Sequence, residues 1–559
     1  MTVTRRGFMA GGLALSGCAP FTYQDALICE PPIPEGPIRI DMHCHLLNMR
    51  DASEGPFVAR RIFNLEEDAA PAVENIAVAL TEAIASILGV GTWGIQRERE
   101  YLRVELNKPL DLTPEGGRKP ARQSNRDFCF FAGNTQPGIF RASAERQITG
   151  FFSTRIRNAA RMMTLFPDID IFLPSIVDLY EGPKIADYMR QIAFYSDLAL
   201  ATRGRFLPLA SFTPEREYED RELFGRSPDD PTRPSQMFWL KRAIDHLGFV
   251  GVKLHPSSGF SPHDNLRWGC LNTPRQRIRE SDRDLYAQFD AYDGYMDELF
   301  AFCKSRDVPV LTHNSDGLSA NRRCMQGAQP EGHGARQLAP TGEMGDPALG
   351  EWTYAARGTG AFETRAEEDW TNAPGAWIAA KEAADTAHPG APLKVILSHL
   401  ANAFDHLRRG PDQVELRPSR WLEIAAEATR RHPDLYIDLS EINEFFAPGM
   451  IDGHRELLRR LLRDTPGLED HIMYGSDWHM PATALTGAEY PALIESLLPA
   501  AARPDVMGRT AARVFGLRPG GQTRARLARF FADPPSVLGT ARPADNSLPL
   551  SEIPWWTRV

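Results

Sequence analysis

The chain has 559 residues, of which 42% are hydrophobic and 24% are charged, so it has an ordinary globular composition and can bury a large core. Its net charge of −10 at pH 7 is mild for this length, and the absence of any lysine and arginine run argues against nucleic acid as a partner. The seven cysteines lack CxxC spacing, which argues against a cysteine zinc site or a disulfide framework, although one disulfide is left open.

The first eighteen residues, 1–18, are typical of an export signal. Arg5 and Arg6 precede a short stretch rich in glycine and alanine, which is the pattern of a twin-arginine signal, and the stretch ends in LSGC. This ending looks like a bacterial lipobox, so we expect Cys18 to be lipidated and to become the mature N-terminus. The sequence thus predicts a periplasmic or cell-envelope lipoprotein that meets a membrane only through the lipid at Cys18. The alternative is a cytosolic enzyme with an apolar N-terminus.

Residues 19–37 are rich in proline and are predicted to form a tether to a domain that begins near Ile38. Eight short apolar runs then have the length of strands: 38–46, 169–177, 205–212, 249–255, 308–314, 393–399, 435–441 and 471–477. Amphipathic stretches of helical length separate them, at 183–202, 234–247, 285–306, 420–432, 453–464 and 487–499. This alternation predicts an α/β fold, a (β/α)8 TIM barrel over 38–517, with an open doubly wound sheet as the alternative.

Two segments are too long to be simple crossovers. The first is an insertion at 47–168, after strand 1, with a candidate helix at 72–88. The second is an insertion at 315–392, after strand 5, with a candidate helix near 375–385. Both insertions follow the C-terminal end of a strand, where active sites of such barrels lie, so we expect them to form a lid or the substrate pocket. Residues 518–559 are predicted to be a C-terminal tail packed on the barrel.

The first predicted strand ends in two histidines. Because side chains alternate along a strand, His43 and His45 point to one side of the sheet and Cys44 points to the other. Zinc and related divalent metals favour neutral imidazole nitrogens, so this pair is a candidate for two ligands of one ion. Taken alone the pattern is weak, because surface or core histidines produce it as well.

Three further candidate residues lie at the ends of other predicted strands. His313 closes the fifth run, His399 closes the sixth, and Asp477 closes the eighth after a short Gly-Ser turn. The C-terminal ends of the strands of a (β/α)8 barrel meet at one face. The histidines and the carboxylate therefore predict a metal site on that face.

The fourth apolar run places Lys253 and His255 on one side of its strand, near the same barrel mouth. Lys253 is either a barrel-interior lysine paired with an acid or a member of the site. His255 is either a packing residue or a group that contacts substrate or a second metal.

The motifs DMHCH, GVKLHP, VLTH, ILSHLAN and MYGSDWHMP span residues 38–481. They resemble the amidohydrolase superfamily, specifically the amidohydrolase-2 group of carboxymuconate-semialdehyde decarboxylases and related lactonases and hydratases. The sequence DVMGRTAARVFGL at 505–517 is similar to the closing helix of that family. The long insertions, the signal and the tail have no counterpart that we can match.

The resemblance also implies roles for the candidate residues. One divalent metal, usually zinc, is held in such proteins by the strand-1 histidines, the strand-5 histidine and the strand-8 aspartate, here His43, His45, His313 and Asp477. His399 matches the strand-6 histidine that polarises the substrate or assists the water. Some superfamily members bridge two metals with a carbamylated lysine on strand 4, and Lys253 leaves this alternative open.

The reaction expected of such a site is hydrolysis of an ester, lactone or amide bond in a small organic substrate. The metal would lower the pKa of water from about 15.7 towards 7, and Asp477 could accept the proton. The alternative is a non-oxidative decarboxylase of a conjugated carboxylic acid, for which Arg122 or Arg126 would supply a carboxylate clamp. A non-catalytic binding lipoprotein is a third hypothesis. The substrate, the metal and the oligomeric state are left open.

Overall fold

The structure is a computed structural model, and it describes fourteen segments of the chain: 25–29, 36–46, 95–107, 129–133, 154–177, 185–256, 260–265, 285–314, 372–401, 404–410, 413–440, 451–478, 489–537 and 547–559. The predicted signal, the candidate helix at 72–88, and Arg122 and Arg126 lie outside these segments. Within them, no helix is both long enough and apolar enough to cross a membrane.

All eight predicted strands are present, and each is shorter than its apolar run. They are β2 (Ile40–Cys44), β4 (Ile171–Pro174), β5 (Leu209–Phe212), β6 (Gly251–Leu254), β7 (Val310–Thr312), β8 (Val395–Leu397), β11 (Leu435–Asp438) and β12 (Ile472–Met473). Every residue of these strands is buried, which explains their near-continuous apolar sequences.

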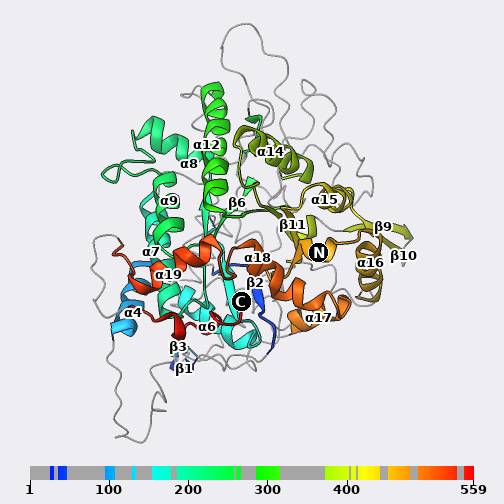
Figure 1. The fold of residues 1–559 in the computed structure, drawn as a ribbon, viewed down its shortest axis with the longest axis horizontal. Coiled ribbons are helices and arrows are strands. Elements are labelled where there is room, and N and C mark those ends of the chain that lie inside the picture. Colours follow the sequence, from blue (N-terminus) through cyan, green and yellow to red (C-terminus); the bar gives the residue numbers. More distant parts are fainter. Residues whose placement is uncertain are drawn as a thin grey trace, which may run out of the picture.

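The strands follow one another in chain order around the barrel. Six of them form one parallel sheet in the order β5-β6-β7-β8-β11-β12, and β2 pairs with β4 in a second parallel sheet. A parallel bridge between Phe172 and Phe206 links β4 to the segment before β5. On the other side, the amide of Met42 donates to the carbonyl of Tyr474, 3.0 Å away, and links β2 to the end of β12. The predicted TIM barrel is confirmed, and helices surround its strands (Figure 1).

The predicted helices also lie where the amphipathic stretches are, within two residues at either end. They are α7 (Ile185–Ala201), α9 (Gln236–His246), α12 (Leu285–Arg306), α14 (Pro374–Ala387), α15 (Arg420–Arg431), α16 (Ile451–Asp464) and α17 (Glu489–Leu497). Helix α15 shows why such a stretch is helical. The side chain of Ser419 accepts a hydrogen bond from the amide of Leu422 and caps the start, and Arg430 and Arg431 in the last turn complement the helix dipole.

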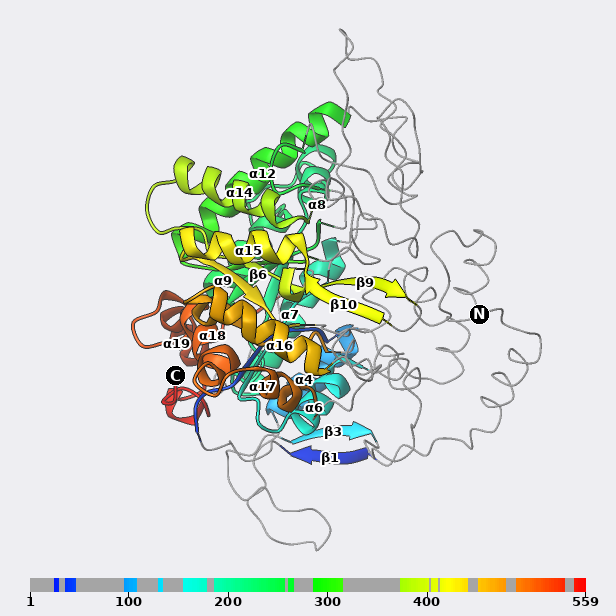
Figure 2. The ribbon, with the colours of Figure 1, turned by 90° about the vertical axis from the view of Figure 1, so that its right-hand side faces the viewer.

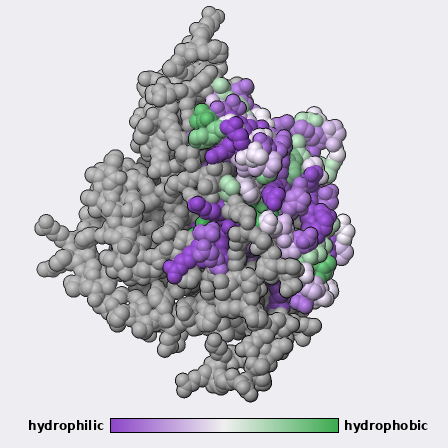
Figure 3. Space-filling model, turned by 90° about the vertical axis from the view of Figure 1, so that its left-hand side faces the viewer, coloured by the Kyte–Doolittle hydropathy of each residue, from purple (hydrophilic) through white to green (hydrophobic). Residues whose placement is uncertain are grey.

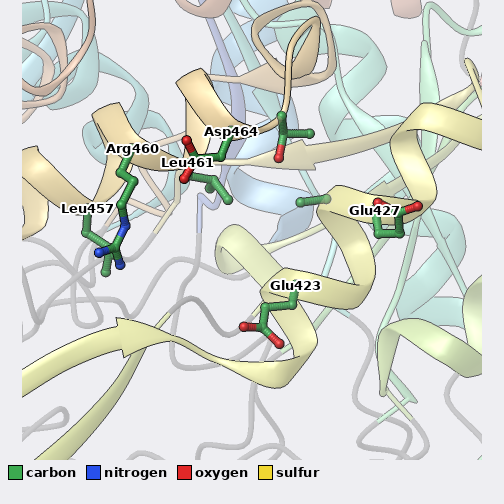
Figure 4. A pocket seen from close by; sticks show the side chains of 8 residues that line it. Glu423, Glu427, Leu457, Arg460, Leu461 and Asp464 are labelled. Atoms are coloured by element: carbon green, nitrogen blue, oxygen red, sulfur yellow. The ribbon is translucent and has the colours of Figure 1, made fainter.

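Helices α15 and α16 lie side by side and line a small open pocket of about 220 Å³ (Figure 4). Its charged lining residues come from the outer helices of the barrel and not from strand ends: Glu423, Glu427, Arg460 and Asp464. The described surface drawn in colour in Figure 3 is mostly hydrophilic. Leu223 and Phe224 are the large hydrophobic side chains that are exposed in the described segments.

The first insertion contains helices α4 (Ile95–Asn107) and α6 (Arg155–Leu165), which we did not predict. Buried ion pairs tie them together and to the barrel: Glu98 of α4 pairs with Arg155 of α6 at 2.8 Å, and Arg99 pairs with Asp197 of α7 at 3.1 Å. A buried charge needs such a partner, so these pairs fix where the insertion lies.

The described part of the insertions and loops also contains two small antiparallel ribbons. Strand β1 (Asp25–Cys29), within the predicted tether, pairs with β3 (Cys129–Gly133) of the first insertion. Strands β9 (Phe404–Gly410) and β10 (Gln413–Pro418) follow β8 and form a hairpin that projects from the body of the molecule (Figure 2). Neither ribbon was predicted.

The C-terminal segment packs against the barrel. After the π-helical turn at Asp505–Arg509 and α18 (Thr510–Val514), helix α19 (Gln522–Ala532) supplies Phe530 and Phe531 to a buried cluster. Trp555 joins this cluster, and its indole N–H donates to the carbonyl of Gly204 at 2.8 Å. The same cluster contains residues of β2, β4, β5 and β12, so the tail covers apolar surface of the strands.

Candidate metal centre

Three of the four predicted metal ligands form one buried group. His43 is the second-to-last residue of β2, His45 follows that strand, and Asp477 follows β12. Their ligand atoms all lie within 4.8 Å of one another. The Nε2 atom of His45 lies 3.0 Å from Oδ1 of Asp477, and Nε2 of His43 lies 3.8 Å from the same oxygen. Two imidazoles and a carboxylate are a donor set that zinc and related ions accept.

Both histidines of this group are oriented through Nδ1. That atom of His43 lies 2.9 Å from Oδ2 of Asp438, and that of His45 lies 3.2 Å from the carbonyl oxygen of Ser175. Since carboxylates and carbonyls only accept, Nδ1 carries a proton in both rings, and Nε2 is the nitrogen left to bind an ion, which would displace the hydrogen bond between His45 and Asp477. The residues therefore fit a divalent ion.

The electrostatics of the group favour the protonation states that bind metals. Burial, then the charge of Lys253, lowers the pKa of His43 to about 4, so its imidazole is neutral. Burial alone would raise the pKa of Asp477, but the hydrogen bond with His45 and the charges of His43 and His45 outweigh it and hold that pKa well below its ordinary value. Neutral imidazole and ionised carboxylate are the forms that ligate.

His313, the fourth predicted ligand, lies beside His399 and not within the group of three. Nδ1 of His313 is 2.9 Å from Nε2 of His399, and the two rings are 4.6 Å apart. The ring of His399 is in turn 5.2 Å from that of His43. An N–H group of one imidazole donates a hydrogen bond to the unprotonated nitrogen of the other, so the two histidines form a hydrogen-bonded pair next to the ligand group.

Lys253 and His255 lie at the same barrel mouth. Lys253 is fully buried, with Nζ 3.0 Å from Nε2 of His43 and 3.2 Å from Oγ of Ser398. The ring of His255 is 6.4 Å from that of His45 and 6.2 Å from that of His313. Burial, then the charge of Lys253, holds the pKa of His255 well below its ordinary value. The chain thus brings all of its predicted strand-end residues to one place.

The family model described as “Amidohydrolase” matches residues 190–517, more than half of the chain. The chain belongs to the amidohydrolase family. As the sequence predicted, it is a metal-dependent enzyme of this family. The match includes Lys253, His313, His399 and Asp477, whereas the paired histidines of β2 lie before it.

Several solved structures are similar to this amidohydrolase at low identity. An uncharacterized TIM-barrel protein from Bordetella bronchiseptica has 15% identity and a TM-score of 0.32, over 68% of this chain and 85% of that chain. A 5-carboxyvanillate decarboxylase from Novosphingobium aromaticivorans, in complex with manganese, has 12% identity and a TM-score of 0.37, over 86% and 96%. An amidohydrolase from Burkholderia multivorans with bound zinc has 13% identity and a TM-score of 0.31, over 63% and 86%. A search of curated proteins finds no match.

Sequence reasoning missed Asp41, which supports the turn that holds Asp477. Asp41 is fully buried in β2 and accepts hydrogen bonds from the amide of Ser476 at 2.9 Å and from its hydroxyl at 2.6 Å. Burial raises the pKa of Asp41 to about 7, although these hydrogen bonds act to lower it. Because Asp41 precedes His43 by two residues, strand alternation already placed both on one face and could have identified it.

Asp438 and Ser440 were missed as well. Asp438 is the last residue of β11. The metal-site candidates on the other strands were identified because they also lie at strand ends. Burial opposes ionisation of Asp438, but the charge of His43 and the hydrogen bond with it lower the pKa of Asp438 to about 2. The same strand-end rule therefore could have found this carboxylate.

The backbone is strained where the site is built. His399, Leu400, Ala401 and Asp477 have φ values of 58°, 49°, 50° and 46°, in the left-handed region that side chains other than glycine disfavour. Hydrogen bonds hold these residues there: the amide of His399 donates to Asp438 at 2.9 Å, and the amide of Asp477 donates to the carbonyl of His43 at 2.7 Å. Strain of this kind is frequent at functional sites.

Proposed function

We propose that this amidohydrolase is a hydrolase that activates water, by means of one divalent ion, against an ester, lactone or amide bond of a small organic substrate. The observation on which this rests is the buried group of His43, His45 and Asp477, in which both Nδ1 atoms are engaged and both Nε2 atoms face the carboxylate. His313 would complete the ligand set. Zinc is the metal that we expect, since two imidazoles and a carboxylate suit it.

When bound, the ion supplies Lewis acidity, which makes water a stronger acid near neutral pH. The residues of the chain have distinct tasks around it. Asp477 is an ionised carboxylate that can accept the proton of the attacking water and later give it to the leaving group. His399, at the mouth beside His313, has Nε2 as a hydrogen-bond acceptor and can assist the attacking water by accepting a hydrogen bond from it.

Decarboxylation of a conjugated carboxylic acid is the second candidate. It is favoured by the buried amine of Lys253 at the centre of the site, because such a group can pair with a substrate carboxylate. In this reaction the carboxylate leaves as carbon dioxide and a proton takes its place on the carbon. Product analysis separates the two candidates, since only the second releases carbon dioxide.

A site with two ions is the alternative to one ion. Its support is that His313 pairs with His399 apart from the other three ligands, and that Nζ of Lys253 lies 3.0 Å from Nε2 of His43. Lys253 would first give up one proton, and carbon dioxide would then add to its amine and form a carbamate with loss of a second proton, giving the lysine two oxygen ligands. One equivalent of metal in both the wild type and Lys253→Met supports a single ion. Two equivalents that fall to one or none in Lys253→Met establish the alternative.

The function is tested by turnover of a panel of esters, lactones, amides and conjugated carboxylic acids. Hydrolysis of at least one class should be abolished by a chelator and restored by zinc or manganese. His399→Asn should lower kcat and leave the metal bound, whereas His388→Ala, a change at a histidine outside the site, should leave kcat unchanged. Turnover that is insensitive to chelation would exclude the proposed function.

We also propose that the enzyme is exported by the twin-arginine route and anchored through a lipid on Cys18. The support is the paired Arg5 and Arg6 and the LSGC sequence. Replacement of both arginines by lysine should keep the protein in the cytoplasm, and Cys18→Ala should move it from the membrane fraction to the soluble one. An unchanged distribution of both variants would rule this proposal out.

A further inference from the structure

We propose that Asp438, together with Ser440, is a positioning group that fixes the tautomer and ring orientation of both His43 and His399. One carboxylate on β11 would then set a metal ligand and the substrate-facing histidine at the same time. The inference rests on the proposed metal site, but it concerns groups whose state is measurable without metal.

Within the described segments, the hydrogen-bond partners of Asp438 are all donors. Its Oδ2 lies 2.9 Å from Nδ1 of His43. Its Oδ1 accepts from the amide of His399 at 2.9 Å, from the amide of Ser440 at 3.0 Å and from the hydroxyl of Ser440 at 2.5 Å. The residue is fully buried, so these hydrogen bonds replace water as its partners.

The hydrogen positions follow from these contacts. A carboxylate supplies no proton, so the hydroxyl hydrogen of Ser440 points at Asp438. The lone pairs of Ser440 Oγ then face Nδ1 of His43 at 2.9 Å and Nδ1 of His399 at 3.1 Å. Both imidazoles must therefore carry their hydrogen on Nδ1.

A contact on the opposite side of the His43 ring agrees with this assignment. Nζ of Lys253 lies 3.0 Å from Nε2 of His43. A charged lysine only donates hydrogen bonds, so Nε2 is the acceptor and Nδ1 bears the hydrogen. For His399, the same tautomer leaves the lone pair of Nε2 toward His313, 2.9 Å away.

Replacing the acid by an amide reverses part of this pattern. In Asp438→Asn an NH2 group stands where an acceptor was, so it meets either the Nδ1–H of His43 or the donors from residues 399 and 440. Relief comes if His43 takes its hydrogen on Nε2, the nitrogen that should ligate the metal. Changes to partners that orient a ligating histidine cost about 10–100-fold in metal affinity, and we expect a loss in that range.

Ser440→Ala tests the orientation of His399 separately from the orientation of His43. The bond between Asp438 and His43 persists, so metal affinity should stay within about threefold of wild type, well short of the loss that removal of a direct ligand partner causes. The hydroxyl partner of His399 is lost, so kcat should fall while KM changes little. Asp434→Asn, a change at a carboxyl before the other end of β11, is the matched control and should alter neither quantity.

The test is nitrogen-15 spectroscopy of histidine-labelled, metal-free protein, with signals assigned by His43→Gln and His399→Asn, and titration of zinc into each variant. We expect hydrogen on Nδ1 of both rings in the wild type, and on Nε2 of His43 in Asp438→Asn together with weaker zinc binding. Hydrogen on Nε2 of His43 in the wild type, or wild-type zinc affinity in Asp438→Asn, would overturn the inference. The wild-type spectrum decides the matter even if the variant does not fold, and it is independent of whether His43 proves to bind metal.

Discussion

Gly475 and His43 approach each other so closely that a methyl group on Gly475 would lie 2.7 Å from Cβ of His43. The same methyl group would lie 3.2 Å from Cβ of Ser440. Neither neighbour can move freely, because both belong to the hydrogen-bonded network of the site. We therefore predict that Gly475→Ala displaces His43 and weakens zinc binding by about tenfold or more, as disturbed ligand orientation does. Isothermal titration of zinc measures this.

Gly294 provides the matched control for that substitution. It lies exposed within α12, and a methyl group there would have no neighbour within 4 Å. Gly294→Ala should leave zinc affinity unchanged and stabilise the fold by about 0.5–1 kcal/mol, the usual difference between glycine and alanine in a helix. Equal zinc affinities for the two variants would show that close packing at Gly475 does not place His43.

The carboxylate of Asp385 should make stability depend on pH. Asp385 accepts hydrogen bonds from Lys304 of α12, from Lys381 of α14 at 2.6 Å and from the amide of Leu393 at 2.7 Å. Burial alone would raise the pKa of Asp385, but the bonds from the two lysines lower it below the ordinary value of 3.8. Because the pKa is lower in the folded protein, ionised Asp385 stabilises the fold when the pH is above the ordinary pKa of 3.8. This contribution disappears as the pH falls through the pKa of the folded state.

Asp385→Asn should consequently reduce the free energy of unfolding by about 1 kcal/mol at pH 7, the net value of such partly exposed hydrogen-bonded pairs. Urea unfolding at pH 7, 5 and 3 measures the difference between the variant and the wild type. That difference should shrink at the lowest pH. A difference that grows as pH falls would have the wrong sign for this explanation.

The tail should contribute strongly to stability through Trp555. This indole is fully buried beside Phe531 and donates to the carbonyl of Gly204. Trp555→Ala should lower the free energy of unfolding by about 3–5 kcal/mol, the cost of removing a large buried aromatic side chain. Trp556→Ala is the control. Trp556 is partly exposed under the guanidinium of Arg524, so its loss should cost about 1 kcal/mol. Denaturant unfolding followed by circular dichroism compares the two variants. Equal losses in the free energy of unfolding would show that the burial of Trp555 does not give it a special part in stability.

The barrel was predictable because its periodicity is strong. Buried parallel strands such as β6 and β7 give unbroken apolar runs, and the helices between them have one apolar face. The ribbon of β1 and β3 was not predictable, since residues distant in the sequence pair there and neither strand alternates clearly. Helix α19 was missed because its three buried apolar side chains, Leu527, Phe530 and Phe531, lie among arginines, which hide the apolar stripe in the sequence.

The site was predictable to the extent that strand ends reveal it. Position alone brought together His43, His45 and Asp477, since parallel strands end on one face. The pairing of His313 with His399 could not be predicted, because it depends on ring orientations that the sequence does not specify. Asp438 escaped notice because an aspartate at a strand end has no motif of its own, although it contacts two of the predicted residues.

If His43 and Asp477 hold a divalent metal ion, the metal content of purified protein depends on both residues. Inductively coupled plasma mass spectrometry of the wild type should find at least one equivalent of zinc or a related ion. His43→Ala and Asp477→Asn should each lose that ion while retaining the circular dichroism spectrum of the wild type, and His388→Ala should keep it. Wild-type metal content in folded His43→Ala or Asp477→Asn would contradict the assignment of the site.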